Sequence, residues 1–507
     1  MKNALNLGLA SLLSLFLVQT ANAQSFNGYA LYNLQNQNTT YLIDKDGNIA
    51  HSWSCSQSCN YTVLLKDNGN IMRGGVYGSN SLNGAAIGGM VQEIDPTGNV
   101  VWEYIYSNSD HCSHHDLTLL PNGNVILTAW EVMSTAELTQ AGVNSPSVEQ
   151  WPTHFIEIQQ DGTGGQIVWE WHIQDHFIQD HDASKDNYGV IADHPELMDV
   201  NLLTVSGGGG GPGGGGGDWF HVNGVDYNST LDQLVFSSRH LSEFIVIDHS
   251  TTTAEAASHS GGNSGMGGDF IYRWGNPSNY GSNGTQTIAA AVHDPRWIPD
   301  GRPNAGYIQY FNNEGGSGGN SAVDAIQAPE NGFMYTMSGT SYGPSNYAWR
   351  HDCLANSTGQ SASDRMSNGN TFVNVSGEYM YEVDASDNMV WQYSAGPTKA
   401  FRYECDHAGV IALLGSDPCG LNALSEETLA NIQFYPNPSS DGIYKIDGVD
   451  IYGNKLITTV VNMYGQVVLE IENSEFIDLS NMPDGVYFAK LLFDGETSIT
   501  KKLTLVR

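Results

Sequence analysis

Short runs of alternating apolar and polar residues, separated by turns, recur from residue 28 to residue 414. One recurring unit is a strand, a turn rich in Asp, Gly and Asn, and a second strand that ends near an aromatic residue. Such turns join antiparallel strands, so each unit predicts a β-hairpin. Four clear copies and two looser ones are present, at 42–53, 93–104, 157–171 and 382–393, and at 246–274 and 332–350.

The second recurring unit is a strand pair that turns at Asn-Gly or Asp-Gly. Its copies lie at 64–70, 119–124, 298–301 and 366–370, with a degenerate copy at 225–236. The two units together make a four-stranded sheet, and a chain of such sheets is typical of a β-propeller. The copies predict six blades, and we expect the apolar run 409–414 to complete the blade that 29–32 begins.

The chain divides into four expected parts. Residues 1–23 are predicted to be a signal peptide, because Lys2 precedes a short apolar run and Ala21-Asn-Ala23 resembles a cleavage site. Residues 24–415 are the predicted propeller, 416–428 a linker, and 429–507 a small β-sandwich, which makes the fold class all-β. An uncleaved anchor is the alternative for the first part, and no later run is long enough for a membrane span.

The net charge and the cysteine content narrow the range of possible partners and predict the state of the cysteines. The net charge of −35 leaves no basic stripe for phosphates, which excludes nucleic acid as a partner, and an anionic substrate would need local cations. Six cysteines in an exported chain predict disulfides. The short loop makes Cys55–Cys59 the expected first pair, with metal binding as the alternative.

Three histidines share one repeat position. Counting back seven residues from the first turn residue gives His115, His221 and His293, and gives Tyr61 and Ser361 in two other blades. Equivalent positions on the innermost strands surround the channel of a propeller, so we expect these histidines to face one another near its mouth.

Further polar residues lie next to these histidines. Arg239 and His240 follow His221 on the next strand, and His114, Asp116, Asn223 and Asp294 form a second set. Imidazole serves as an acid or base, as a nucleophile or as a metal ligand, and it also lines wet channels without function. A second metal hypothesis concerns the loop histidines, which are His172, His176, His181 and His194.

The C-terminal part carries a specific resemblance. Tyr435–Pro438, Val460–Gly465, Met482–Tyr487 and Lys501–Arg507 are similar to the type IX secretion sorting domain of Bacteroidetes. The resemblance implies the type IX secretion machinery as a partner, passage through the periplasm, and a protein that is secreted or on the cell surface. A carbohydrate-binding appendage is the alternative.

The propeller resembles the aryl-sulfate sulfotransferase family of six-bladed propellers, on the segments 114–124, 218–225 and 236–240 and on His293. This likeness implies transfer of sulfate from a phenolic sulfate ester to a phenol acceptor through a sulfated histidine, with no nucleotide cofactor and no metal. His221 and His293 match histidines that bind the transferring group, and Arg239 and His240 match the strand near them. With His115 they are the candidate catalytic residues.

Two positions depart from the family pattern. Phe311–Ser317 lacks the family's arginine, and Thr371–Gly377 lacks its late histidine, for which His351 or His407 is the candidate replacement. These departures keep two alternatives open: a non-catalytic binding propeller for an extracellular glycan, phenolic or protein ligand, and a metal-dependent hydrolase or lyase.

Overall fold

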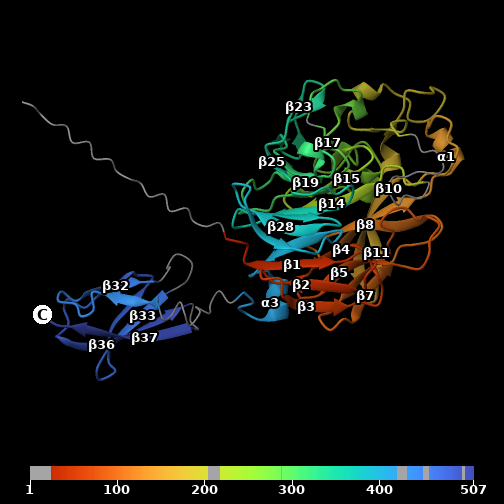
Figure 1. Cartoon of the computed structure of the whole chain (residues 1–507). Helices are drawn as coiled ribbons and strands as arrows, with labels where there is room; N and C mark the ends of the chain where they lie inside the picture. The colour runs from red at the N-terminus through yellow and green to blue at the C-terminus, as the bar shows by residue number, and fades with distance from the viewer. Residues whose placement is uncertain (1–23, 204–216, 287, 420–430, 449–455, 494–496) are drawn as a thin grey trace, which may run out of the picture.

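The structure is a computed structural model, and the residues it describes are 24–203, 217–286, 288–419, 431–448, 456–493 and 497–507. The predicted signal peptide lies outside the described residues, as does most of the expected linker. Six four-stranded antiparallel sheets form the blades of the first unit of the chain, and one three-stranded and one four-stranded sheet form the second unit (Figure 1). No helix in the described ranges is long and apolar enough to cross a membrane.

Each of the six blades is one four-stranded sheet, so the predicted six-bladed propeller is confirmed. The blades are numbered here in chain order, each with its innermost strand first. Blade 1 contains β30 (Ala400–Glu404), β1 (Gly28–Asn33), β2 (Thr39–Ile43) and β3 (Ile49–Ser54), and blade 2 contains β4 (Cys59–Leu65), β5 (Ile71–Val76), β6 (Gly89–Ile94) and β7 (Val100–Ile105). Blade 3 contains β8 (His111–Leu119), β9 (Val125–Glu131), β10 (Thr153–Asp161) and β11 (Gly164–His172), and blade 4 contains β14 (Val222–Asn228), β15 (Gln233–Ser238), β16 (Glu243–Asp248) and β17 (Phe270–Trp274). Blade 5 contains β18 (Val292–Trp297), β19 (Ile308–Asn312), β20 (Ala322–Ile326) and β25 (Trp349–Asp352), and blade 6 contains β26 (Ala362–Arg365), β27 (Thr371–Val375), β28 (Tyr379–Val383) and β29 (Met389–Tyr393).

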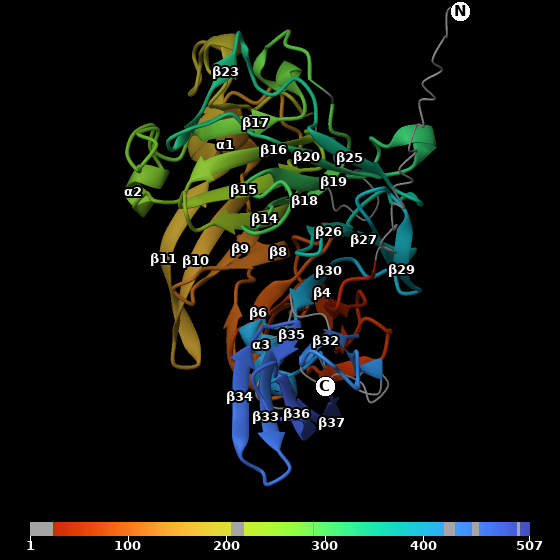
Figure 2. The same cartoon turned by 90° about the vertical axis from the view of Figure 1, so that its left-hand side faces the viewer.

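The six innermost strands surround the centre of the propeller. In Figure 2 the labels β4, β8, β14, β18, β26 and β30 follow one another around the middle of the unit. Contacts between β4 and β8, β8 and β14, and β14 and β18 join neighbouring blades at this level. The first residues of these strands therefore lie at one mouth of the channel and their last residues at the other.

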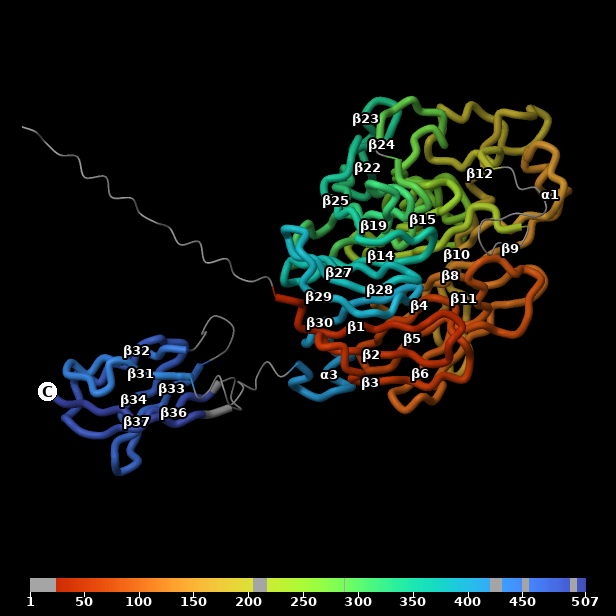
Figure 3. The backbone as a smooth tube through the Cα atoms, in the orientation of Figure 1, coloured from red at the N-terminus to blue at the C-terminus, as the bar shows by residue number. Residues whose placement is uncertain are grey.

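The ring closes in the expected blade but with a different strand. β30 pairs antiparallel with β1, so Tyr32 lies opposite Ala400 (Figure 3). The expectation that 409–414 would be this strand is wrong, because Ala408–Leu414 forms helix α3. A short apolar run fits a strand or a buried helix equally well, and His407 caps this one by accepting a hydrogen bond from the Gly409 N–H.

The turn signatures of the repeat have a common physical basis. In the outer hairpins of three blades, one carboxylate oxygen of Asp44, Asp95 or Asp384 accepts two backbone N–H bonds from the turn that follows. The two repeat units also bind each other within a blade. Asn70 donates to Glu93 at 2.6 Å, and the equivalent Asn124 donates to Glu157. The recurring Asp, Asn and Glu therefore stabilise each blade.

Blade 5 differs from its prediction. Its outer pair is β20 and β25, and the expected strand near residue 332 belongs instead to an insertion between them. That insertion contains only short hairpins, so the looser copy at 332–350 was correct only in its second half. The short elements of this insertion are β21 (Glu330–Asn331), β22 (Met334–Tyr335), β23 (Met337–Ser338) and β24 (Ser341–Tyr342).

The remaining helices and short strands lie in the connections. They are helices α1 (Thr135–Gln140) and α2 (Thr253–Ala256), the 3₁₀ helices η1 (Ile173–His176), η2 (Ile191–Asp193), η3 (Pro277–Tyr280) and η4 (Ser317–Gly319), and strands β12 (Phe177–Ile178) and β13 (Met198–Asp199). Capping boxes begin both α1 and α2, at Ser134 with Glu137 and at Thr252 with Glu255.

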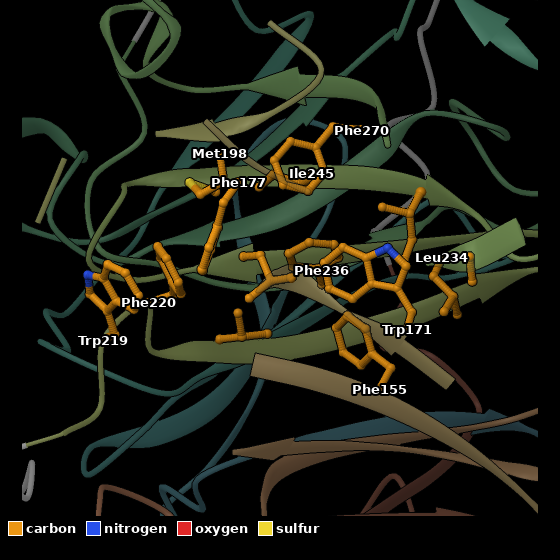
Figure 4. Close-up of a cluster of buried hydrophobic side chains, with 14 of the residues drawn as sticks. Phe155, Trp171, Phe177, Met198, Trp219, Phe220, Leu234, Phe236, Ile245 and Phe270 are labelled. Atoms are coloured by element: carbon orange, nitrogen blue, oxygen red, sulfur yellow. The ribbon is translucent and has the colours of Figure 1, made fainter. Parts of the chain in front are cut away.

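The largest apolar cluster lies between blades 3 and 4. Figure 4 shows Phe236 near its middle, Trp171 and Phe155 on one side, and the stacked rings of Trp219 and Phe220 on the other. Trp219 and Phe220 are almost fully buried. Because they directly precede His221, this core anchors the chain at the point where it enters the innermost strand of blade 4.

The C-terminal unit is a small β-sandwich, as predicted. Its three-stranded sheet has the order β31-β32-β35 and its four-stranded sheet the order β34-β33-β36-β37. One apolar cluster, which includes Tyr444, Val460 and Leu503, forms its core. The strands are β31 (Gln433–Tyr435), β32 (Ile443–Asp447), β33 (Leu456–Asn462), β34 (Val467–Glu472), β35 (Phe476–Asp478), β36 (Gly485–Phe493) and β37 (Thr497–Leu505).

The expected pairing of Cys55 with Cys59 is wrong. In the part of the chain that the structure describes, the disulfide joins Cys405 to Cys419 and ties the segment after α3 to the end of β30. Cys55 and Cys59 are buried free thiols. Their short spacing reflects the passage from the outer strand of blade 1 to the innermost strand of blade 2, and their sulfur atoms lie near different carbonyl groups, those of Trp53 and Leu34.

Candidate functional site

The innermost strands depart from regular pairing where the histidines lie. Ladder irregularities occur between Ser113 and Leu117 in blade 3, between Val222 and Gly224 in blade 4, and between His293 and Arg296 in blade 5. Such bulges re-aim side chains and are frequent beside functional sites.

Two of the histidines have left-handed backbone. The φ angles are 48° at His115 and 50° at His221, and in blade 5 the left-handed residue is Asp294, directly after His293. A left-handed conformation costs a residue with a Cβ about 1–2 kcal/mol, so the surrounding fold must hold it in place.

A cavity of about 280 Å³ lies at the channel mouth where the innermost strands begin. His221, His293 and Arg239 line it, together with Tyr61 and the segment 357–360. Three of the predicted catalytic residues, from blades 4 and 5, therefore lie around one cavity. Tyr61, which shares the repeat position of the histidines, lies there as well.

His221 is held by a buried carboxylate. Its Nδ1 lies 2.6 Å from Asp218 Oδ2, and the Nε1 of Trp130 donates to Asp218 Oδ1 at 3.0 Å. Burial raises the pKa of Asp218, but the neighbouring His221 and its hydrogen bond outweigh burial and lower the pKa to about 2. An ionised Asp218 accepts the Nδ1–H of His221, and in the neutral tautomer with this bond the lone pair of the ring is on Nε2.

The Nε2 of His293 also carries a lone pair, but different groups bond the Nδ1 of this ring. Its Nδ1 lies 2.7 Å from Asn313 Oδ1 and 3.0 Å from the Ala291 carbonyl, and its buried Nε2 has no hydrogen-bond partner among the described residues. Burial, followed by the nearby His221, lowers the pKa of His293 well below its ordinary value. His293 is therefore neutral, with its proton on Nδ1 and a free lone pair on Nε2.

His115 and His240 flank His221 and do not line the cavity. Their ring centroids lie 4.8 Å and 4.9 Å from that of His221. His115 Nδ1 bonds His114 Nδ1 at 2.7 Å, and His240 Nδ1 donates to the Trp219 carbonyl at 2.9 Å. Both residues support the position of the His221 ring.

Arg239 is the cation of the cavity lining. Its Nη2 donates to the Thr358 carbonyl at 2.9 Å and lies 3.5 Å from Glu314 Oε1, and the Glu314 side chain is 53% exposed. This pairing is long and open to solvent, so it is weak. The guanidinium retains N–H groups for an anion in the cavity.

Lys399 is a buried cation that the sequence analysis missed. Its Nζ lies 2.7 Å from Asp116 Oδ2 and 3.2 Å from Asp294 Oδ1. Burial lowers the pKa of Lys399, but the two carboxylates outweigh it and raise the pKa above its ordinary value. Lys399 directly precedes β30, so assigning that strand correctly would have placed it at the channel.

The second polar set of the sequence analysis joins the blades. Asp116 accepts the Val225 N–H at 2.9 Å, Asp294 accepts the Ser363 N–H at 3.2 Å, and Asn223 donates to the Val292 carbonyl at 2.9 Å. Each bond crosses from one innermost strand to the next. These residues therefore stabilise the ring and lie beneath the cavity.

The other candidate histidines lie outside the channel. His351 of blade 5 forms hydrogen bonds with Asp387 and Tyr381 of blade 6, and His407 caps α3. The loop histidines do not form one cluster either. His176 bonds Asp269, His194 bonds Glu196, and His172 bonds Glu131.

The six blades surround a central channel, and histidines from two neighbouring blades line a cavity at one of its mouths. The chain matches the profile of the arylsulfotransferase family over residues 14–336 and belongs to that family. Residues 433–506 match a secretion system C-terminal sorting domain. The protein is therefore exported by type IX secretion to the cell surface or the extracellular space.

Solved structures of low identity are also similar to this chain. A protein of unknown function from Bacteroides caccae is 10% identical, with a TM-score of 0.40, over 74% of this chain and 98% of that chain. The periplasmic gluconolactonase of Pseudomonas aeruginosa is 11% identical, with a TM-score of 0.36, over 94% of this chain and 99% of that chain. The search of curated proteins found no match.

Proposed function

We propose that this protein transfers a sulfuryl group from a phenolic sulfate ester to a phenol, with His221 as the nucleophile. The observation that carries the proposal is the convergence of His221, His293 and Arg239 on one cavity, with Asp218 behind His221. The assignment of residues 24–415 as the catalytic propeller, 416–428 as a linker and 429–507 as a sorting domain belongs to this proposal.

In the first half-reaction, the Nε2 lone pair of His221 attacks the sulfur of the donor. An N–S bond forms, and the S–O bond to the phenol breaks, with its electron pair remaining on the departing phenolate. The sulfated imidazole carries a positive charge, which the ionised Asp218 at 2.6 Å stabilises. The phenolate leaves as the anion or takes a proton from water.

In the second half-reaction, the acceptor phenol attacks the same sulfur. The neutral Nε2 of His293 accepts the phenol proton while the new O–S bond forms and the N–S bond returns its electron pair to His221. His293 later loses that proton to solvent. Burial lowers the pKa of His293, which keeps its imidazole neutral before the transfer and favours the later release of the proton to solvent.

Arg239 supplies the local cation that the charge of −35 makes necessary. Its guanidinium would bind the sulfonyl oxygens, which carry negative charge at every stage of the transfer. Lys399 already pairs with two carboxylates at the channel floor, so it contributes little further positive charge.

The alternative is a propeller that binds an extracellular glycan, phenolic or protein ligand without turnover. Glu314 favours it, because a carboxylate 3.5 Å from Arg239 weakens the attraction of the cavity for anions. This alternative predicts a ligand that binds the cavity and is recovered unchanged.

The test uses purified protein, a donor that releases a coloured phenol, and a second phenol as acceptor. We expect steady-state colour release, beyond one phenol per chain, that requires the acceptor and fails in His221→Ala and in His293→Ala. The control is His194→Ala, an exposed histidine bonded to Glu196 outside the cavity. Wild-type rates in both cavity variants would contradict the proposal, and binding without turnover by wild type would favour the alternative.

A further inference from the structure

A second group of metal-ligating side chains lies on one face of blade 3, away from the cavity. His154 is the register partner of both Ala129 on β9 and His172 on β11, and His111 on β8 is the partner of Glu131. Cross-strand partners share a face, and so do residues two apart on one strand. His111, Glu131, His154 and His172 therefore lie on the same face, near the same end of the sheet.

His154 has a ring nitrogen that no group in the described chain satisfies. The residue is 1% exposed, its Nε2 lies 2.8 Å from the Tyr106 hydroxyl, and its buried Nδ1 has no partner. Tyr106, which follows the last strand of blade 2, also stacks on His111. When Nε2–H donates to the Tyr106 oxygen, Nδ1 carries a lone pair that is free to bind a cation.

The neighbours of this nitrogen complete a ligand set. One ligand atom each from Glu131, His154 and His172 lies within 4.8 Å of the other two. His172 Nδ1 lies 2.9 Å from Glu131 Oε1, and its Nε2 lies 3.7 Å from Glu170 Oε2. His154 is buried, whereas the side chains of Glu131 and His172 are 17% and 25% exposed, so an ion can enter from the outer edge.

We propose that Glu131, His154 and His172 form a binding site for one zinc ion. Two imidazole nitrogens and one carboxylate oxygen are ligands that zinc prefers, and a fourth position is left for water or for Glu170. Zinc ligands lie about 2.1 Å from the metal and so about 3.4 Å from one another, which requires these side chains to close by about 1 Å. The rings of His154 and His172 are nearly parallel, so His172 rotates to bind. Its position at the partly exposed edge of β11 permits this rotation.

The site would link the starting points of two long connections between strands. The segment that contains α1 begins directly after Glu131, and η1 begins directly after His172. Phe177 and Met198 from the second connection pack in the same core as Trp219 and Phe220, and the Phe177 ring contacts both (Figure 4). A bound ion would therefore stabilise blade 3 and the connections that cover the anchor of His221.

The described chain holds one other group of this kind, formed by His176, His259 and Asp269. There both ring nitrogens of His176 already bond protein oxygens, Nδ1 at 2.7 Å to Asp269 and Nε2 at 2.8 Å to the Ala256 carbonyl. It offers no free buried nitrogen, which makes it a matched control.

The test is a calorimetric titration of chelator-treated, tag-free full-length protein with zinc chloride. We expect one ion per chain, a rise in the unfolding temperature, and, with cobalt in place of zinc, the visible absorption of a four-coordinate ion. Each of His172→Gln and Glu131→Gln should weaken zinc binding at least about 10-fold. Their unfolding temperatures should rise less on addition of zinc than that of wild type, which separates the loss of the ion from the loss of the His172–Glu131 pair.

Two results would overturn the proposal. One is the absence of stoichiometric zinc uptake by folded wild-type protein. The other is uptake that persists in the double variant His172→Gln with Glu131→Gln but is lost in His259→Gln. Neither result depends on sulfuryl transfer, so this site and the proposed function are tested separately.

Discussion

The two mouths of the channel differ in what their charged groups already bind. Where the innermost strands end, a cavity of about 110 Å³ is lined by four arginines. Three of these cations pair with carboxylates: Arg296 with Asp364, Arg302 with Glu404 at 3.6 Å, and Arg402 with Glu382. The fourth, Arg365, stacks on Trp349, and its buried Nε and Nη2 have no hydrogen-bond partner among the described residues. Where the strands begin, His221 lines the cavity, the Nε2 of His293 has no hydrogen-bond partner among the described residues, and the carboxylate that pairs with Arg239 is the exposed Glu314 at 3.5 Å.

This difference distinguishes charged groups that stabilise the fold from charged groups that are available to bind a ligand. Charges that are buried and paired hold neighbouring blades together, and their removal leaves an uncompensated partner. Groups that are held in position on one side and open on the other are available to a ligand. In an acidic chain, the number of arginines at a cavity is therefore a weaker guide to an anion site than the partners of those arginines.

The sharpest contrast is expected from His221→Ala. Loss of the attacking nitrogen should lower kcat by at least about 10³-fold, without a change in the temperature of unfolding beyond a few degrees. Steady-state release of coloured phenol and thermal unfolding measure the two quantities. A His221→Ala variant that retains a tenth or more of the wild-type rate would contradict the claim that the functional site lies at the mouth where the innermost strands begin.

The opposite mouth should respond in stability instead. Arg402→Met leaves Glu382 buried without its cation and should lower the free energy of unfolding by about 3–5 kcal/mol. The rate per folded molecule should not change. Lys45→Met, which removes a solvent-exposed pair with Asp46, is the control and should cost less than about 1 kcal/mol. If Arg402→Met abolished transfer while leaving stability intact, the arginine mouth would be the functional one.

Asp218→Asn tests how His221 is held. The amide can still accept the Trp130 N–H, but its NH₂ group would donate to Nδ1 and move the imidazole proton to Nε2. The lone pair then no longer faces the donor, so kcat should fall about 10²- to 10⁴-fold with little change in KM. Asp161→Asn, on the exposed outer hairpin of blade 3, is the matched control. A kcat equal to wild type would show that Asp218 does not position the nucleophile.

The smallest expected effect is on the pH dependence of stability. An unfolded chain protonates His293 near pH 6.5, but the pKa of the folded residue lies well below that value, mainly because it is buried. The unfolded state therefore binds more protons below about pH 6.5, and stability falls as the pH falls, by about 1.4 kcal/mol per pH unit for this group. His293→Gln should reduce the slope by that amount between pH 6 and 4, in urea unfolding, whereas Lys45→Met, at an exposed pair with Asp46, should not. An unchanged slope in His293→Gln would mean that the folded residue is charged.

The site was predictable from the sequence to the extent that the blades repeat. A fixed offset from the turn found His221 and His293, because the turn lies at one end of the innermost strand and the cavity lies at the other end. Arg239 followed from its place on the next strand. These predictions needed only local spacing, which a propeller preserves from blade to blade.

Other features depended on contacts between distant segments. Lys399 was missed because the closing strand was assigned ten residues too late, to a run that forms α3. Asp218 lies three residues before His221 and was noted only as part of a motif, since its bond to His221 depends on the left-handed backbone of His221 itself. The pairing of Cys405 with Cys419 likewise depends on the helix that intervenes.

The most direct test is to trap the intermediate. Protein incubated with the coloured aryl sulfate and no acceptor should release up to one phenol per chain in a rapid burst, and mass spectrometry should find one sulfuryl group on His221. The His221→Ala variant should give neither the burst nor the modification. A modification on another residue, or a folded protein that releases no phenol and carries no sulfuryl group, would contradict the account.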